Sequence, residues 1–206
     1  MLRLSLLVCL LSGGLSFAAP AALARTILVF GDSLSAGYGI RQDAAWPSLL
    51  EKRLRENKFD YSVANASISG ETTSGGRARL GDILDKQAPD IVIIALGSND
   101  GLRGLPVAAM RDNLLAMTDS AQKKKARVLI VGQRLPPNYG PYAVQFHAAF
   151  GEVAKAKKTA YVNFLLDGVA LTQELFQADN LHPTAAAQPR LLDNVWRGLE
   201  PLLKQR

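Results

Sequence analysis

Five short apolar runs recur along the chain, and each is followed by a stretch in which apolar residues have helical spacing. The runs are 26–30, 61–65, 90–95, 127–131 and the weaker 160–164. The helical stretches are 47–55, 76–86, 106–123, 141–157 and 183–203. Strands of continuous apolar content, each followed by a helix, are typical of a parallel sheet covered on both faces. We therefore predict a three-layer, flavodoxin-like α/β fold with a five-stranded parallel sheet.

An open parallel sheet also predicts where a ligand binds, because ligands of such sheets lie beyond the carboxyl ends of the strands. The segments that follow the expected strands are therefore the ones to search for chemistry. They are 31–33, 66–70, 96–100, 133–140 and the loop after the fifth strand.

The scarcity of histidine narrows the choice of a general base, since the chain has only two. His147 lies within a helical stretch beside Phe146 and Phe150, where a structural role is the simpler interpretation. His182 lies in a polar turn before the last helical stretch, three residues after Asp179. In a turn, that spacing can bring the carboxylate to the imidazole and hold the ring in one tautomer. We expect His182 to be the base.

A candidate nucleophile follows the first expected strand, in the sequence Gly31-Asp32-Ser33. The glycine permits a sharp exit from the strand, after which Ser33 falls near the start of a helical turn with its hydroxyl exposed. The alternative is that Asp32 or Ser33 only caps a helix. The chain contains no Gly-x-Ser-x-Gly, so it lacks the nucleophile elbow of the α/β-hydrolases.

Two further residues could stabilise a negative charge on a reacting oxygen. Gly70 follows the second expected strand and allows a backbone N–H to approach a ligand closely. Asn99 follows the third and carries a neutral amide donor. If the first strand lies between the second and third, these residues and Ser33 lie on neighbouring strand tips. Ordinary turn residues would not account for all three positions.

Composition and charge narrow the function classes. The length of 206 residues suits one domain. The formal charge is +6, yet the basic residues are dispersed and the only tight run is Lys123-Lys124-Lys125, so we expect no nucleic-acid partner. The single cysteine, Cys9, lies in the N-terminal apolar stretch, which leaves the rest of the chain without a disulfide or thiolate chemistry.

The N-terminus has the pattern of a signal peptide. Arg3 precedes a leucine-rich run at 4–11, and Ala22-Leu23-Ala24 offers the small-x-small pattern that signal peptidase accepts. The alternative is an uncleaved membrane anchor, which the glycines and the proline before residue 22 disfavour. We expect residues 1–24 to be removed and residues 25–206 to form a periplasmic or secreted hydrolase domain.

The ordered motifs resemble those of the SGNH (GDSL) hydrolases. The four blocks are Gly31-Asp-Ser-Leu34, Gly70, Gly97-Ser-Asn-Asp100 and Asp179-Asn-Leu-His182. The longer strings 64–70, 99–104 and 134–140 resemble the bacterial periplasmic subgroup of multifunctional thioesterases, lysophospholipases and arylesterases. One departure is Ser98, which stands where that subgroup often has a second glycine.

The resemblance implies a role for each matching position. Ser33 would be the nucleophile, His182 the base and Asp179 its orienting acid. The oxyanion hole would be formed by the backbone N–H groups of Ser33 and Gly70 and by the Asn99 side chain. Asp32 and Asp100 would organise loops rather than catalyse. We add four candidates for the substrate-binding wall: Trp46, Leu102, Pro136 and Tyr139.

The implied activity is hydrolysis of carboxylic esters and thioesters through an acyl-enzyme. It requires no metal and no organic cofactor. The substrate would be a small-molecule or lipid acyl ester, and the enzyme a monomer with at most peripheral membrane contact. A carbohydrate acetylesterase of the same fold is the alternative function within the family.

Two other classes remain open from the residues alone. A metal-dependent hydrolase could use Asp32, Asp100, Asp179 and His182 as ligands of a hard cation. A flavodoxin-like binding protein could hold an anion at a helix N-terminus without catalysis.

Overall fold

The structure, a computed structural model, describes residues 25–205, and its centre is a parallel sheet of five strands. The strands are β1 (Arg25–Gly31), β2 (Tyr61–Asn65), β3 (Ile91–Ala95), β4 (Arg127–Val131) and β5 (Ala160–Val162). Their order in the sheet is β2-β1-β3-β4-β5, and every neighbouring pair is parallel. This is the flavodoxin-like order, so both the predicted fold class and the predicted central position of β1 are confirmed.

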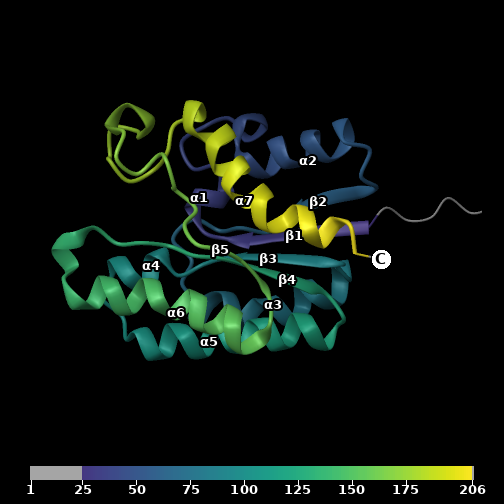
Figure 1. Cartoon of the computed structure of the whole chain (residues 1–206), viewed down its shortest axis with the longest axis horizontal. Helices are drawn as coiled ribbons and strands as arrows, with labels where there is room; N and C mark the ends of the chain where they lie inside the picture. Colours follow the sequence, from purple (N-terminus) through teal and green to yellow (C-terminus); the bar gives the residue numbers. More distant parts are fainter. Residues whose placement is uncertain (1–24, 206) are drawn as a thin grey trace, which may run out of the picture.

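Helices cover both faces of the sheet. They are α1 (Ser33–Ala36), α2 (Trp46–Glu56), α3 (Thr73–Gln87), α4 (Ser98–Leu102), α5 (Val107–Lys123), α6 (Pro141–Lys157) and α7 (Gln188–Leu203). Short 3-10 turns add η1 (Gln42–Ala44), η2 (Pro137–Tyr139), η3 (Gln173–Leu175) and η4 (Ala185–Ala187). Figure 1 shows α2 and α7 on one side of the sheet and α3, α5 and α6 on the other.

Alternate side chains of each strand enter the two cores, as the pleat of a strand requires. In β1, Ile27 and Val29 pack with α2 and α7, whereas Leu28 and Phe30 pack with α3, α5 and α6. All four side chains are fully buried. Because both faces of the sheet are covered, the central strands β1, β3 and β4 are buried along most of their length, which explains their continuous apolar runs in the sequence. The edge strand β2 is only partly buried and includes the polar residues Ser62 and Asn65.

The structure differs from the prediction at the last helix. We expected a helix from Pro183, but α7 begins at Gln188. Pro183 instead forms an isolated antiparallel bridge with Phe176. The Gln177 N–H donates to the His182 carbonyl at 2.8 Å, which closes the loop that carries His182. The five residues of α4 also escaped prediction, because so short a helix shows no periodicity.

The carboxyl ends of all five strands lie at one end of the molecule, on the left in Figure 1. That end carries α1, α4 and the long loop between β5 and α7. The opposite end carries the carboxyl ends of the larger helices. Within residues 25–205, the helices lack the combination of length and apolar content that a membrane span requires.

Candidate active site

Ser33 occupies the first position of α1, directly after β1. Asp32 is the N-cap of this short helix, and its Oδ1 accepts a hydrogen bond from the Leu34 N–H at 3.1 Å. The capping interpretation of the sequence therefore holds for Asp32. Ser33 is the first helical residue rather than the cap, so its hydroxyl is available to another partner.

That partner is His182, from the loop before α7. Its Nε2 lies 2.9 Å from the Ser33 Oγ, and its Nδ1 lies 2.7 Å from the Asp179 Oδ2. With the carboxylate at Nδ1, that nitrogen carries the proton and donates it to Asp179, which leaves Nε2 to accept from the Ser33 hydroxyl. The structure thus brings together the three residues that the motifs single out.

A tight turn holds Asp179 beside the imidazole. Its Oδ1 accepts the backbone N–H groups of Leu181 and His182, each at 3.0 Å, and Asn180 takes a left-handed conformation with φ of 54°. The His182 N–H, the His182 ring and the Leu181 N–H lower the pKa of Asp179 to about 2. The carboxylate is therefore ionised at neutral pH and stabilises a positive charge on the ring.

The expected oxyanion donors lie at the tips of the strands on either side of β1. Gly70 follows β2 with φ of 79°, a conformation that disfavours a side chain. Asn99 lies in α4, after β3, and its amide donates to the Glu71 carbonyl at 3.0 Å. This bond ties the Asn99 side chain to the turn that carries Gly70, so the two donors are positioned as a unit.

Two arginines that we did not single out hold this turn in place. Arg79 of α3 donates to the Glu71 carboxylate at 2.6 Å and to the Ala66 carbonyl at 2.8 Å. Arg103, after α4, donates to the Gly70 carbonyl at 3.1 Å. Arg103 lies within the string 99–104 that carries the resemblance, although we assigned it no role, whereas Arg79 lies outside every motif.

Asp32 is a buried carboxyl directly beneath the nucleophile. Burial raises its pKa from 3.8 to about 6, and the Leu34 N–H, the Ser98 hydroxyl and the nearby His182 oppose part of the rise. Ser98, the departure noted in the third motif, thus faces this carboxyl.

Asp100 has the organising role that we expected of it. Its two oxygens accept the Thr73 N–H at 2.8 Å and the Thr73 hydroxyl at 2.6 Å. Thr73 is the first residue of α3, so the bonds join α4 to the start of that helix. Both side chains are almost fully buried.

One predicted substrate-binding residue is wrong. Trp46 has no exposed surface and packs in the core with Leu50 and Leu54 of its own helix. A side chain closed off in this way cannot line a pocket that is open to solvent. Leu102, Pro136 and Tyr139 lie at the carboxyl end of the sheet with part of their surface exposed, and their assignment stays a prediction.

Tyr38 is a neighbour of the histidine that sequence reasoning missed. Its ring centroid lies 4.4 Å from that of His182, and half of its surface is exposed. Gln177 holds the Tyr38 carbonyl at 2.8 Å. The other histidine, His147, contacts the Gln133 carbonyl through Nδ1 at 3.0 Å, as suits a structural role.

The ligand set of a metal-dependent hydrolase is not assembled. Asp100 is engaged with Thr73, and Asp32 is closed off beneath Ser33. Between residues 25 and 205, no three histidine, cysteine, aspartate or glutamate side chains gather as metal ligands would.

Known proteins resemble both the sequence and the fold. A model of the GDSL-like lipase/acylhydrolase family matches residues 29–189. Esterase TesA of Pseudomonas aeruginosa is 51% identical over 183 residues, which cover 88% of this chain and 91% of the relative. Thioesterase 1/protease 1/lysophospholipase L1 of Escherichia coli (strain K12) is 39% identical over 184 residues, with 89% and 87% covered.

Solved structures agree with these relatives. A crystal structure of TesA superposes with a TM-score of 0.85 at 50% identity and covers 86% of this chain and 99% of that one. The psychrotrophic esterase EstA from Pseudoalteromonas, inhibited by monoethylphosphonate, gives a TM-score of 0.83 at 38% identity, with 88% and 100% covered. The chain therefore belongs to the GDSL-like lipase/acylhydrolase family and is a carboxylic ester hydrolase.

Proposed function

We propose that the chain hydrolyses acyl esters and thioesters through a covalent acyl-enzyme on Ser33. The observation that carries the proposal is the continuous hydrogen-bonded path from Asp179 through His182 to the Ser33 hydroxyl, at 2.7 and 2.9 Å. A serine hydroxyl is a weak nucleophile until a positioned base removes its proton. This path provides such a base and fixes its tautomer.

The reaction then has two similar halves. His182 accepts the Ser33 proton while Oγ attacks the substrate carbonyl, and the imidazolium returns the proton to the leaving alcohol or thiol. Water then attacks the acyl carbon while His182 takes its proton. The bond between the acyl carbon and Ser33 Oγ breaks, the imidazolium returns the proton to Oγ, and the carboxylic acid is released. In both halves the tetrahedral intermediate carries a negative oxygen, for which we assign the Ser33 N–H, the Gly70 N–H and the Asn99 amide as donors.

The substrate range is proposed from the relatives. Their names include esterase, arylesterase, thioesterase and lysophospholipase. A common machinery suits all these reactions, because each involves attack on an activated acyl carbonyl. An activity profile across acyl chain length, with oxygen esters and thioesters in parallel, tests the range. Activity confined to acetyl esters of sugars would favour the acetylesterase alternative.

The test of the nucleophile is the variant Ser33→Ala assayed with p-nitrophenyl butyrate. The substitution removes one oxygen at the start of a short helix and leaves the Asp32 cap in place. We expect turnover to fall to the background rate while thermal unfolding is unchanged. Near-full activity of the variant would rule out Ser33 as nucleophile. Ser48→Ala, a hydroxyl that bonds the Gln42 carbonyl away from the triad, is the matched control.

We further propose that the enzyme is exported as a monomer after cleavage behind Ala24. The signal peptide lies outside the described residues, but β1 begins at Arg25, so cleavage there leaves every described element intact. N-terminal sequencing of the protein from a periplasmic extract tests this. We expect the first residue to be Arg25, and an N-terminus at Met1 would contradict the proposal.

A further inference from the structure

The large hydrophobic side chains that the described residues leave exposed all follow the carboxyl end of a strand. In strand order they are Tyr38 after β1, Ile68 after β2, Leu102 and Leu105 after β3, Val144 after β4, and Leu171 and Leu181 after β5. Each of the five strand-to-helix connections, or the first turn of the helix that follows, therefore contributes at least one. Scattered single exposed residues are ordinary, but concentration at one end of a molecule is not.

We divide these side chains into two arcs at this end of the molecule: Tyr38, Leu171 and Leu181 in the first, and Ile68, Leu102, Leu105 and Val144 in the second. In the first, the Tyr38 ring contacts His182, Leu181 precedes His182 in the chain, and Leu171 is fully exposed in the same long loop. In the second, Arg103 joins the α4 segment to the Gly70 turn. The Tyr142 hydroxyl donates to the Leu105 carbonyl at 2.6 Å, which links this segment to the start of α6 and to Val144.

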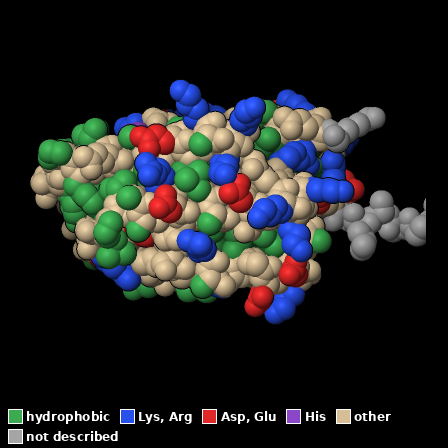
Figure 2. All heavy atoms as spheres, turned by 90° about the horizontal axis from the view of Figure 1, so that it is seen from below, with side chains coloured by type: hydrophobic (Ala, Val, Ile, Leu, Met, Phe, Trp, Pro, Cys, Tyr) green, Lys and Arg blue, Asp and Glu red, His purple; other side chains and the backbone are tan. Residues whose placement is uncertain are grey.

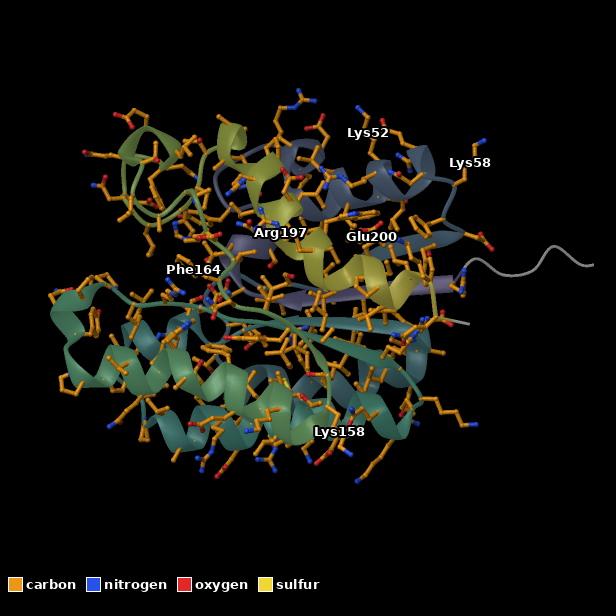
Figure 3. The ribbon with its side chains drawn as sticks, in the orientation of Figure 1. Lys52, Lys58, Lys158, Phe164, Arg197 and Glu200 are labelled. Carbon is orange, nitrogen blue, oxygen red and sulfur yellow. The ribbon has the colours of Figure 1, made fainter. Side chains whose placement is uncertain are left out.

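Two surface cavities lie apart from the triad. The surface carries a cavity of about 290 Å³ beside β5 and α7, where Figure 3 labels Phe164 and Arg197. A second, of about 370 Å³, lies between α5 and α6. Neither is lined by a residue of the triad. The apolar side chains at this end of the molecule are therefore the surface along which we expect an acyl chain at Ser33 to lie.

The two ends of the molecule differ in their lysine content. Every lysine lies within a helix or just past its end, and none lies in a connection that follows a strand's carboxyl end. Lys58 and Lys158, for example, follow α2 and α6 directly and project from the half of the molecule away from the triad (Figure 3). Figure 2 shows hydrophobic side chains gathered at the left end and basic ones over the middle and right.

Three arginines in the strand-to-helix connections each interact with another group of the protein. Arg41 pairs with Asp43 at 2.7 Å, Arg103 donates to the Gly70 carbonyl, and Arg134 lies over the Phe164 ring at 5.0 Å. In these connections the exposed acids Asp43, Glu174 and Asp179 offset the charges of the three arginines. The connections therefore carry no cationic surplus to attract an anionic surface, whereas a zwitterionic surface requires none.

We propose that the two arcs dock the enzyme onto the surface of a zwitterionic amphiphile aggregate, such as a lysophosphatidylcholine micelle, with the triad facing that surface. The proposal rests on the acyl hydrolase function and extends it to substrates presented in aggregates. Insertion of exposed leucine and valine side chains among acyl chains supplies the attraction through burial of apolar surface. The acyl ester of a docked lipid then has a short path to Ser33.

The test compares an aggregated substrate with a dispersed one. The variants are Leu171→Ser and Val144→Ser, one on each arc and neither in the catalytic machinery. Leu171→Met and Val144→Ile keep the apolar character as matched controls, and Lys86→Ser changes the opposite end. Each protein is assayed on lysophosphatidylcholine below and above its critical micelle concentration and on soluble p-nitrophenyl butyrate.

We expect the native enzyme to gain activity above the critical micelle concentration. The kcat/KM on micelles should be about tenfold lower in each serine variant, because one apolar side chain no longer contributes to the contact with the micelle. Their activity on the soluble ester should be unchanged, and the matched controls should behave as the native enzyme does. Equal losses on micellar and soluble substrate, or no loss, would overturn the proposal.

Sedimentation with vesicles identifies the surface. The native enzyme should bind phosphatidylcholine vesicles that contain lysophosphatidylcholine, and the double variant L171S/V144S should not. Binding that needs phosphatidylglycerol and persists in the double variant would place the contact at the lysine-rich end and refute the proposal. A wrong assignment of Ser33 would give a different result, because the variant Ser33→Ala would then still hydrolyse the soluble ester.

Discussion

Asp32 and Asp179 both act on His182, and their surroundings shift their pKa values in opposite directions. Hydrogen bonds from His182 and Leu181 lower the pKa of Asp179 to about 2, so it is an anion wherever ester hydrolysis is measured. Burial raises the pKa of Asp32 to about 6, so this carboxyl changes charge near neutral pH. The two acids near His182 therefore differ in charge close to neutral pH, and Asp32 is the one that caps α1.

The raised pKa of Asp32 has a consequence for stability. Since the folded-state value of about 6 lies above 3.8, the folded protein binds more protons between these two pH values. Stability should therefore fall as the pH rises from about 4 to about 6. Asp32→Asn keeps an oxygen for the Leu34 N–H but cannot ionise, so it should be more stable at pH 7.5 by up to about 3 kcal/mol.

Urea denaturation at pH 4 and at pH 7.5 measures this difference. The two proteins should have similar free energies of unfolding at pH 4, where Asp32 is protonated, and diverge at pH 7.5. A variant less stable than the native enzyme at pH 7.5 would show that the ionised Asp32 carboxylate does not destabilise the folded protein.

Replacing Asn99 tests one of the donors that we assign to the oxyanion hole. Asn99→Ala should lower kcat by about 10²–10³ with little change in KM, because the amide is needed for the charged intermediate more than for the ground state. Steady-state kinetics on p-nitrophenyl butyrate provide the measurement. Asn57→Ala, at the far end of α2, is the control and should leave both constants unchanged. A kcat within twofold of the native value would remove Asn99 from the assigned donors.

At the scale of elements, the central strands were predictable because burial on both faces favours continuous apolar residues. Two strands, β2 and β4, match their expected limits. The last helix was placed too early, because proline is common at a helix start and nothing nearby in sequence signals the bridge of Pro183 to Phe176. The burial of Trp46 was not predictable either, because the sequence does not show whether an aromatic residue at a helix start faces the core or the solvent.

The site was predictable where its residues follow strands or share one turn. Ser33, Gly70 and Asn99 lie within five residues of the ends of β1, β2 and β3, and Asp179 lies in the turn that carries His182. Contacts between segments that are distant in sequence were not predictable, because they depend on the tertiary arrangement. The stacking of Tyr38 on His182 and the reach of Arg79 to the Gly70 turn belong to this second kind.

Asp100 joins two elements, so its removal tests how far the site depends on their alignment. Asp100→Ala leaves the buried Thr73 N–H and hydroxyl without their acceptor, which should lower the free energy of unfolding by about 3 kcal/mol. Since Asn99 is the preceding residue in α4, kcat should fall as well. Asp112→Ala on the exposed surface of α5 is the control. Unfolding at the native urea concentration would contradict the assigned role.

At the scale of the whole molecule, the fold separates two chemical environments. One end gathers the carboxyl ends of the strands, the triad and the exposed hydrophobic side chains. The other gathers the ends of the helices and most of the lysines, where the helix dipoles favour positive charge. The parallel topology produces this division by itself, since every strand and every large helix runs in a fixed direction.

The most direct test of the account is covalent capture of the nucleophile. A fluorophosphonate reacts with an activated serine and remains attached, because its phosphorus imitates the tetrahedral intermediate. Tandem mass spectrometry of the inactivated enzyme should find one adduct, on Ser33. The variant Ser33→Ala should carry no adduct. An adduct on another residue, or full inactivation of the enzyme without an adduct on Ser33, would contradict the central claim.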